Sequence, residues 1–246
     1  MTNLKNKTAI ITGSSKGLGK KTALELAGKS VNVVINYNSN KAEAESTVNE
    51  IISNGGNAIA IKADVSKREE VDILFKKTIE HFGKVDIIIN NAGIMITKFL
   101  KDFSEEEFDK QFSINVKSVF LMMKTASEKL EQNGRIINIS SSTSRLMMPA
   151  YAVYSATKSA VEQMTRVFAK EIGNRGITVN SVLPGPINTE LFLEGKSDEL
   201  ITRIASLSAF NRIGNVDDII PIILFLSSDD SRWITGQNIG INGGMA

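Results

Sequence analysis

The chain has 246 residues and a formal net charge of +2, with 29 Lys and Arg residues against 27 Asp and Glu residues. That length fits one large α/β domain or two small ones, and a core of this size needs no covalent crosslink. The lack of cysteine excludes disulfides, thiolate metal sites and a cysteine nucleophile. A single histidine, His81, argues against a His-rich zinc site and a Ser-His-Asp hydrolase, so we expect no metal.

Charge and hydropathy also bear on partners and location. Because the charges nearly balance, the sequence offers no basic surface for nucleic acid. The richest apolar run, 219–226, contains Pro221 and is far shorter than the roughly 20 residues of a bilayer span. The polar start, 1–7, does not resemble a signal peptide. We therefore expect a cytoplasmic protein that binds neither nucleic acid nor a membrane.

Short β-branched runs alternate along the chain with longer segments of helical spacing. In chain order the pattern predicts a strand at 8–12, a helix at 18–27, a strand at 31–36, a helix over 42–52, a strand at 58–61, a helix over 71–79, a strand at 85–89, a helical stretch over 103–130 with a break near Asn115, a strand at 136–139, a helix over 152–172, a strand at 177–183, a helix near 216–226 and a strand at 237–241. Strands and helices that alternate in this way form right-handed βαβ units around a parallel sheet. The strands are nearly continuous apolar runs, which fits a sheet buried on both faces. No linker or charge block divides the chain, so we expect a single domain over 1–246.

A glycine-rich turn follows the first predicted strand, with the sequence Thr12-Gly13-Ser14-Ser15-Lys16-Gly17-Leu18-Gly19. Glycine permits positive φ and a close backbone approach to a phosphate, and the N-terminus of the next helix presents free N–H groups. A tight turn in any α/β protein has similar glycines, so this signal is weak alone. The spacing also differs from the G-x-G-x-x-G pattern of the standard dinucleotide fingerprint.

Tyr154 and Lys158 stand four residues apart and therefore share one face of the predicted helix over 152–172. A free tyrosine, with a pKa of about 10, is a poor acid or base at neutral pH. A lysine ammonium about 4 Å away favours the phenolate by roughly 4 kcal/mol at an effective dielectric of about 20, so we expect it to lower the pKa of the phenol. Ser141 lies 13 residues before Tyr154, at the carboxyl end of a predicted strand, where open α/β sheets bind ligands.

The other tyrosines show how specific this arrangement is. Tyr37 and Lys41 have the same spacing, but the residue 13 positions before Tyr37 is a leucine. Tyr151 has a serine, not a lysine, four positions later. Only Tyr154 has both partners, so we expect it to be the tyrosine with a function in catalysis.

In order along the chain, these residues resemble the motifs of the short-chain dehydrogenase/reductase family. The resemblance rests on the T-G-x-x-x-G-x-G turn at 12–19, the adenine-contacting pair Asp64-Val65, the motif Asn90-Asn91-Ala92-Gly93, the four catalytic positions Asn115, Ser141, Tyr154 and Lys158, and the nicotinamide-side loop with Pro184-Gly185 and Thr189. It implies a Rossmann-type doubly wound parallel sheet of about seven strands, in the order 3-2-1-4-5-6-7, with helices on both faces. It also implies a substrate lid at 188–210 and a homotetramer, with a dimer as the alternative.

The resemblance further implies a role for each site residue. Tyr154 would protonate the substrate oxygen, Ser141 would orient that oxygen, Lys158 would bind ribose, and Asn115 would hold a water that links Lys158 to solvent. The residues that would bind the cofactor are Gly13, Ser15, Lys16, Gly17, Leu18, Gly19, Asn36, Tyr37, Asn38, Ser39, Asp64, Val65, Asn91, Ala92, Gly93, Tyr154, Lys158, Pro184, Gly185, Ile187 and Thr189.

The choice of nicotinamide cofactor depends on the end of the second predicted strand. In enzymes that use NAD, an acidic residue is expected there to bind the ribose 2′-hydroxyl. The segment Asn36-Tyr37-Asn38-Ser39 contains no acidic residue. Lys16 is placed to pair with a 2′-phosphate, whereas the arginine expected after the strand is missing, and Asn38 takes its place. The sequence therefore favours NADP(H), with NAD(H) as the alternative.

We expect an NADPH-dependent ketone reductase, most similar to 3-oxoacyl-acyl-carrier-protein reductases. Glu131-Gln132-Asn133 stand where such enzymes carry basic residues that meet the acidic carrier, although Arg175 matches a second basic site. A small free ketone or a quinone is therefore an alternative to an acyl thioester. Two further alternatives are a dehydrogenase of glucose-like sugars and a cofactor-sensing protein without catalysis. Met95, Met147 and Met148 line either the substrate pocket or the core.

Overall fold

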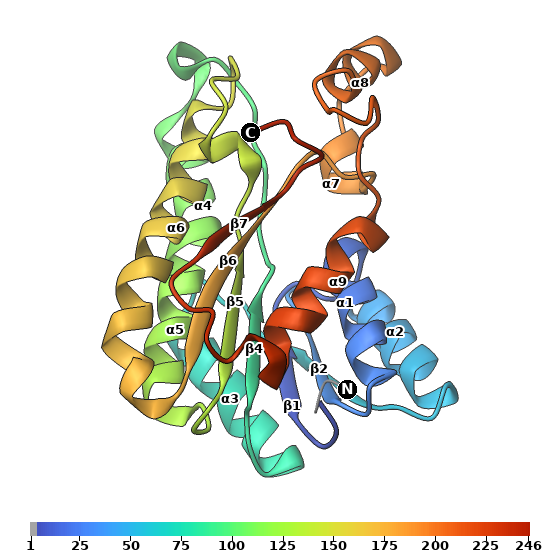
Figure 1. Cartoon of the computed structure of the whole chain (residues 1–246), viewed down its shortest axis with the longest axis vertical. Coiled ribbons are helices and arrows are strands. Elements are labelled where there is room, and N and C mark those ends of the chain that lie inside the picture. The colour runs from blue at the N-terminus through green and yellow to red at the C-terminus, as the bar shows by residue number, and fades with distance from the viewer. Residues whose placement is uncertain (1–3) are drawn as a thin grey trace.

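The structure is a computed structural model that describes residues 4–246, so the first three residues of the polar start lie outside it. Seven strands form one parallel sheet in the order β3-β2-β1-β4-β5-β6-β7 (Figure 1). They are β1 (Thr8–Ile11), β2 (Asn32–Tyr37), β3 (Asn57–Lys62), β4 (Ile87–Asn90), β5 (Arg135–Ile139), β6 (Thr178–Pro184) and β7 (Asn238–Ile241). This order confirms the predicted Rossmann-type, doubly wound sheet.

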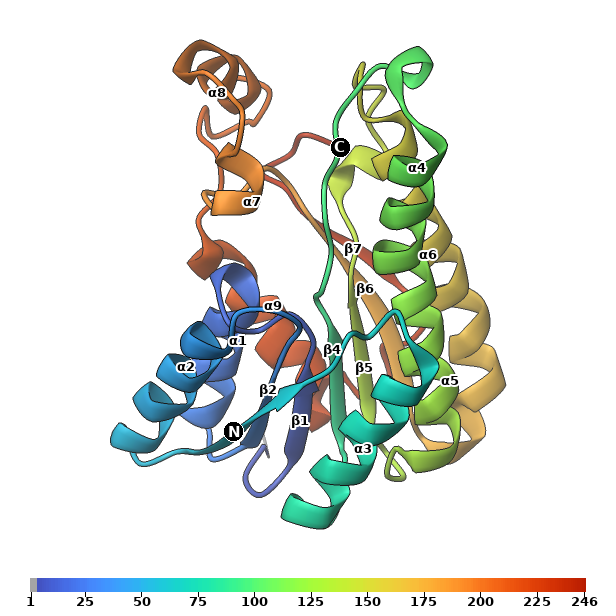
Figure 2. The same ribbon diagram turned by 180° about the vertical axis from the view of Figure 1, so that it is seen from behind.

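Helices cover both faces of the sheet, as Figures 1 and 2 show from opposite sides. On one face lie α1 (Gly17–Ala27), α2 (Lys41–Ser53) and α9 (Val216–Ser227). On the other lie α3 (Arg68–Phe82), α4 (Glu105–Phe112), α5 (Ser118–Lys129) and α6 (Ala152–Ile172). Two short helices, α7 (Glu190–Leu193) and α8 (Asp198–Ala205), follow β6 and occupy the predicted lid range.

Each face of the sheet has its own buried core because successive strand residues point to opposite sides. Ile10 and Ile88 pack in the cluster that includes residues of α3, α5 and α6. Ile11 and Ile89, their neighbours in sequence, pack in the cluster that includes residues of α1 and α9. This double burial explains the continuous apolar runs that predicted the strands.

The helical stretch over 103–130 shows where the predicted break falls. The residues around Asn115 form a turn of π-helix, η2 (Ser113–Lys117), which joins α4 to α5. A π turn closes its hydrogen bonds five residues apart and so accommodates one residue more than an α turn. The other predicted strands and helices are all present, with ends displaced by three residues or fewer.

The parallel arrangement brings the carboxyl ends of β1, β4, β5 and β6 to one edge of the sheet. The strand order reverses between β1 and β4, and this is the point where open α/β sheets bind ligands. The glycine turn follows β1 directly, and Asn91 and Ser141 follow the ends of β4 and β5. None of the helices within residues 4–246 combines the length and the apolar composition of a bilayer-spanning segment.

Close packing at Gly19 gives a test of this edge. A Cβ at Gly19 would lie 2.6 Å from both the Asn91 Nδ2 atom and the Gly13 carbonyl oxygen. We expect Gly19→Ala to lower the free energy of unfolding by about 1–3 kcal/mol, because this contact leaves no room for a methyl group. Gly28→Ala is the matched control, since it ends the same helix at φ −61° with its nearest contacts at 3.5 Å. Urea denaturation compares the two, and equal stabilities would contradict the close packing.

Candidate active site

The glycine turn after β1 has the shape of a phosphate cradle. Gly13 adopts φ +60°, and a Cβ there would lie 3.0 Å from the Cα atom of Ala92. Gly17 adopts φ +56°, and a Cβ there would meet no atom within 4 Å, so the space above the start of α1 is open. Lys16, at the N-cap of α1, makes no capping hydrogen bond with its side chain. A helix N-terminus with uncapped N–H groups beside open space fits the diphosphate of a dinucleotide.

Thr12 and Asn91 join this turn to the end of β4. The Thr12 Oγ1 atom accepts hydrogen bonds of 3.0 Å from the backbone N–H groups of Asn91 and Ala92. The Asn91 side chain donates in turn to the carbonyl oxygens of Thr12 and Gly13, at 3.0 and 2.9 Å. Asn91 therefore braces the glycine turn from the neighbouring strand.

Asn36 has a supporting position that the sequence did not indicate. Its Oδ1 atom accepts from the Gly13 N–H at 3.3 Å, and its Nδ2 atom donates to the carbonyl oxygens of Ile61 and Ala63. With its amide used in this way and its side chain buried, Asn36 holds the glycine turn against β2 and β3. Tyr37 is also buried in the core.

The remaining residues predicted to lie around the adenosine sit at the ends of β2 and β3. Asn38 and Ser39 are exposed. The Asp64 carboxylate accepts from the backbone N–H and the hydroxyl of Ser66, at 3.0 and 2.7 Å, while Val65 is buried. The ends of β2 and β3 therefore present polar side chains, and the end of β2 carries no acidic residue.

Lys16 and Glu190 form an ion pair of 2.6 Å that connects the glycine turn to α7. Both side chains are exposed. The hydrogen bond and the charge of Glu190 raise the pKa of Lys16 above its ordinary value, so this lysine stays charged. A cation is thus held at the rim of the cradle.

Tyr154 and Lys158 lie on one face of α6, as their spacing predicted. The Lys158 Nζ atom is 5.6 Å from the centroid of the Tyr154 ring and donates to the Ile139 carbonyl oxygen at 2.8 Å. A Cβ at Gly93 would lie 3.6 Å from Lys158 Nζ and 3.3 Å from Asn115 Oδ1. The end of β4, α6 and the π turn therefore meet around Gly93.

The Ser141 hydroxyl is held by two hydrogen bonds from one neighbouring residue. Its Oγ atom accepts from the backbone N–H and the hydroxyl of Thr143, at 3.2 and 3.1 Å. Because a serine hydroxyl has two acceptor positions and one proton, that proton is left to be donated elsewhere. The Ser141 side chain also acts to lower the pKa of Tyr154. Thr143 was not predicted, and only its position two residues after Ser141 marks it.

The π turn aims the Asn115 side chain at the segment after β4. Asn115 Oδ1 accepts from the Ile94 N–H at 2.8 Å, and Nδ2 donates to the Ile94 carbonyl oxygen at 2.9 Å and to Thr157 Oγ1 at 3.2 Å. The amide thus ties that segment to α6, directly beside Lys158. Gln111, one turn earlier, accepts from the Ile96 N–H in the same way.

The titration behaviour of the buried pair differs from the sequence-based expectation. Burial raises the pKa of Tyr154 to about 12, although the hydrogen bond with Ser141 acts in the opposite direction. Burial lowers the pKa of Lys158 to about 8. The expected depression of the phenol pKa is therefore wrong for this structure, because the loss of solvation dominates the shift of each group.

The nicotinamide-side loop leaves β6 and packs on the C-terminal segment. A Cβ at Gly185 would lie 2.9 Å from the Cα atom of Asn242, so glycine allows this contact. Thr189 caps α7 with its hydroxyl, and Ile187 pairs with Gly214. Pro184, Gly185, Ile187 and Thr189 thus shape the loop through internal contacts.

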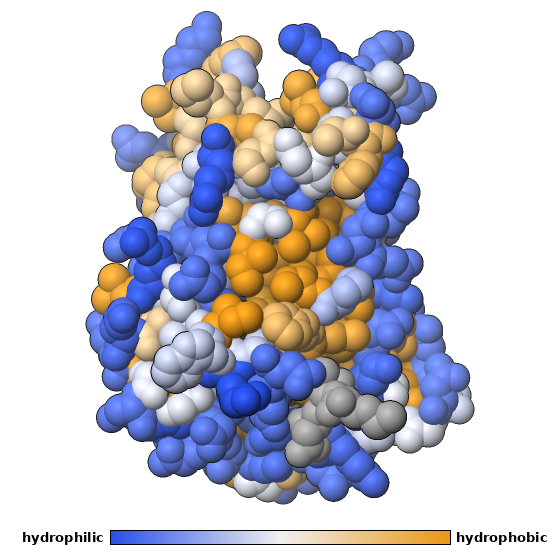
Figure 3. Space-filling model, viewed as in Figure 1, coloured by the Kyte–Doolittle hydropathy of each residue, from blue (hydrophilic) through white to orange (hydrophobic). Residues whose placement is uncertain are grey.

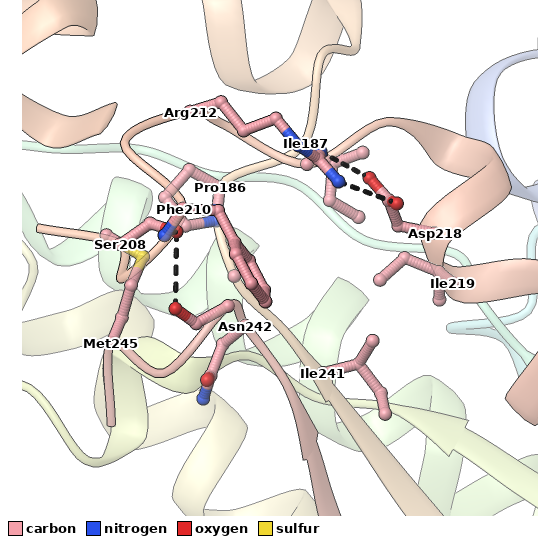
Figure 4. A pocket seen from close by; sticks show the side chains of 13 residues that line it. Pro186, Ile187, Ser208, Phe210, Arg212, Asp218, Ile219, Ile241, Asn242 and Met245 are labelled. Carbon is pink, nitrogen blue, oxygen red and sulfur yellow. Dashed lines mark hydrogen bonds and ion pairs between the residues drawn. The ribbon is translucent and has the colours of Figure 1, made fainter. Parts of the chain in front are cut away.

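A pocket of about 210 Å³ lies behind this loop (Figure 4). Phe210 and Met245 contribute apolar surface, and Arg212 forms a two-bonded ion pair with Asp218 at its rim. None of the four predicted catalytic residues lines it. Met147 is fully exposed, so it lines neither a pocket nor the core. The candidate active site is therefore the group of side chains around Gly93.

Comparisons with known proteins agree with this geometry. A family model described as enoyl-(acyl carrier protein) reductase matches residues 13–246. The chain is 42% identical to the NADPH-dependent aldehyde reductase-like protein, chloroplastic, of Arabidopsis thaliana, over 98% of this chain and 94% of that protein.

Two solved structures are also similar. The short-chain dehydrogenase/reductase from Serratia marcescens superposes with a TM-score of 0.94 at 31% identity, over 98% of each chain. The angucycline C-6 ketoreductase LanV with bound NADP superposes with a TM-score of 0.93 at 34% identity, over 99% of this chain and 97% of that one. With this similarity along nearly its whole length, and with the sheet order that the family resemblance implied, the chain belongs to the short-chain dehydrogenase/reductase family of oxidoreductases.

Proposed function

We propose that this enzyme reduces the carbonyl group of an apolar ketone or aldehyde to an alcohol, with NADPH as the reductant. The observation that carries the proposal is the convergence of Tyr154, Lys158 and Ser141 beside a glycine turn with the shape of a diphosphate site. The printed names of two similar proteins support it, one an NADPH-dependent aldehyde reductase-like protein and the other a ketoreductase with bound NADP.

The site has residues for both parts of such a reaction, which are the binding of the cofactor and the protonation of the carbonyl oxygen. The first turn of α1, Lys158 and the loop with Thr189 would hold the cofactor, which supplies a hydride to the carbonyl carbon when bound. Tyr154 donates its phenolic proton to the carbonyl oxygen. Ser141, whose oxygen already accepts two hydrogen bonds from Thr143, donates a hydrogen bond to the same oxygen and keeps its proton. In this way the developing alkoxide is stabilised and then protonated.

The protonation states suit reduction at neutral pH. With a pKa of about 12, Tyr154 is a neutral phenol that has a proton to give. With a pKa of about 8, Lys158 carries its charge at pH 7. Oxidation of an alcohol needs the phenolate instead, and burial disfavours that form.

Removal of the phenol is the first test. We expect Tyr154→Phe to lower kcat for ketone reduction by about 10²–10⁴-fold, because the proton donor is lost, while the Kd for NADPH changes less than about threefold. Tyr151→Phe is the matched control, since its ring lies 6.4 Å from that of Tyr154 but has no lysine one turn later. Steady-state kinetics and cofactor fluorescence measure the two effects. Unchanged turnover in Tyr154→Phe would refute the mechanism.

The buried lysine gives a test that needs no cofactor. A lysine whose folded pKa, about 8, lies below its unfolded value of 10.5 opposes folding most strongly below pH 8, and this cost declines as the pH rises toward 10.5. Lys158→Met should therefore raise the free energy of unfolding by more at pH 7 than at pH 10, with a difference of a few kcal/mol between the two pH values. Urea denaturation of both proteins at the two pH values measures it. A difference independent of pH would show that Lys158 is not desolvated.

Cofactor choice depends on Lys16 and on the acid-free end of β2. We expect Lys16→Ala to raise the Kd for NADPH about tenfold and to change that for NADH less than twofold, because one ion pair with the 2′-phosphate contributes about 1.4 kcal/mol. Lys20→Ala is the matched control, since Lys20 also lies on α1 and pairs with Glu50 at 2.8 Å. Titrations followed by fluorescence measure both constants. Equal losses for the two cofactors would remove Lys16 as a phosphate ligand.

Arg175, the basic residue weighed for an acyl-carrier substrate, and Arg135, near it in the structure, both form hydrogen bonds within the chain. Arg175 donates to the carbonyl oxygens of Ser127 and Leu130 at the end of α5. Arg135 is buried and bonds to Asp229 and to backbone carbonyls. This occupancy favours a free ketone over a carrier-bound thioester.

The segments that flank the site carry exposed apolar side chains, and these support an apolar substrate. They are Phe99 and Leu100 after β4 and Leu191 in α7. A panel of cyclic and aromatic ketones, an acetoacetyl thioester and glucose, each with both cofactors, tests the assignment. Ketone reduction supports it, whereas glucose oxidation alone, or cofactor binding without turnover on any carbonyl, would overturn it.

We propose further that residues 188–210, with α7 and α8, form the substrate lid of a single domain. We also propose that copies of the chain associate through β7 and α9, as a tetramer or a dimer in the cytoplasm. An apolar area on the side of the molecule that carries β7 and α9 supports this association (Figure 3). The half-buried Ile222 and Phe225 of α9 and Ile239 and Ile241 of β7 contribute apolar surface there.

A further inference from the structure

A buried carboxylate lies behind the active site, and the reaction outlined above does not use it. Glu162 is on α6, one turn after Lys158, and its side chain is 10% exposed. Its Oε1 atom accepts from the Ser140 hydroxyl at 2.9 Å, and its Oε2 atom accepts from the Arg145 guanidinium at 3.2 Å. Among the described residues, Arg145 is the one cation paired with it.

These two partners stand on either side of Ser141 in the sequence. Ser140 precedes Ser141 at the end of β5, and Arg145 ends the 3₁₀ turn η3 (Ser142–Ser144) that follows it. Within the turn, the Ser144 hydroxyl donates to the Ser141 carbonyl oxygen at 2.8 Å, and the Arg145 N–H donates to that of Ser142 at 3.0 Å. One carboxylate on α6 thus holds both ends of the segment that carries Ser141.

This link matters because Tyr154, Lys158 and Glu162 are on the same helix. A shift of the Ser141 segment along α6 would change the distance between the serine hydroxyl and the phenol, and both must reach the same substrate oxygen. Among the described residues the Glu162 carboxylate pairs with Arg145 and not with Lys158, whose Nζ atom donates to the Ile139 carbonyl oxygen. The carboxylate therefore contacts the elements that carry the catalytic groups and not those groups themselves.

We propose that Glu162 and Arg145 are positioning residues that fix Ser141 relative to Tyr154. The proposal rests on the proposed reductase function. If it holds, loss of the Arg145 contact loosens the Ser141 segment, and this lowers kcat without weakening the binding of the cofactor.

The main variant is Arg145→Gln, which removes the half-exposed partner of the buried carboxylate. Asp229→Asn is a matched control, because it removes the half-exposed partner of a buried ion, Arg135, at the amino-terminal end of β5. The two pairs have similar lengths, 3.2 and 3.1 Å, and similar exposure of the outer side chain, 49% in each. The two substitutions should therefore shift Tm alike, while only Arg145→Gln affects catalysis.

We expect Arg145→Gln to lower kcat about tenfold, with KM and the Kd for NADPH each changed less than about twofold. Arg145→Lys, which keeps the charge, should recover more than half of the loss. In a Ser141→Ala background the same Arg145→Gln change should lower kcat less than about twofold further, because the residue it positions is gone. Steady-state and single-turnover kinetics on one ketone measure these effects.

Three results would overturn the proposal. They are a normal kcat in Arg145→Gln, a change confined to KM, and a full tenfold loss that persists in the Ser141→Ala background. The second would mean that Arg145 contacts substrate directly. Failure of the proposed function has a different signature, since the unaltered enzyme would then reduce no ketone at all.

Discussion

The hydrogen bonds that Thr12 receives from the end of β4 hold the two halves of the sheet together where the site lies. Its hydroxyl oxygen accepts hydrogen bonds from the N–H groups of Asn91 and Ala92, and the Asn91 side chain donates two hydrogen bonds to backbone carbonyl oxygens of the glycine turn. Gly13 and Gly19 make this approach possible, because a Cβ at either position would meet the β4 segment at 3.2 Å or less. The cradle for a diphosphate and the wall of the active site are thus a single bonded unit.

Burial and charge compete at the centre of that unit. Removal of water from Tyr154 and Lys158 favours the neutral form of each, which means a protonated phenol and a lysine that loses its proton more readily. The Ile139 carbonyl oxygen supplies one partner for the ammonium, and the hydrogen bond with Ser141 partly offsets the shift of the phenol. Tyr154 is therefore a protonated phenol, and this is the form that reduction of a carbonyl requires.

The sequence predicted the fold well because its signals are local and repeated. Continuous apolar runs, helical spacing and glycine positions each report on a few neighbouring residues, and the family resemblance implied the order of the strands. The four-residue spacing of Tyr154 and Lys158 predicted their common face for the same reason.

What the sequence did not predict depends on contacts between distant segments. Asn36 gave no sign that its amide is occupied by Gly13 and Ala63, since those partners come from other strands. The pKa of Tyr154 was predicted in the wrong direction because the extent of burial is a property of the assembled crevice. Glu162 looked like any other charged residue of an amphipathic helix until Ser140 and Arg145 were placed against it.

The turn of π-helix at 113–117 sets the direction in which the Asn115 amide points. Successive residues of an α-helix are rotated by about 100° around its axis, but the wide π turn accommodates its extra residue locally, so the helices on either side need not rotate. Deletion of one residue from this turn would leave a continuous, regular helix without the wide turn in which Asn115 lies. The geometry of the amide beside Lys158 thus depends on a one-residue difference in chain length, a change that no substitution can reproduce.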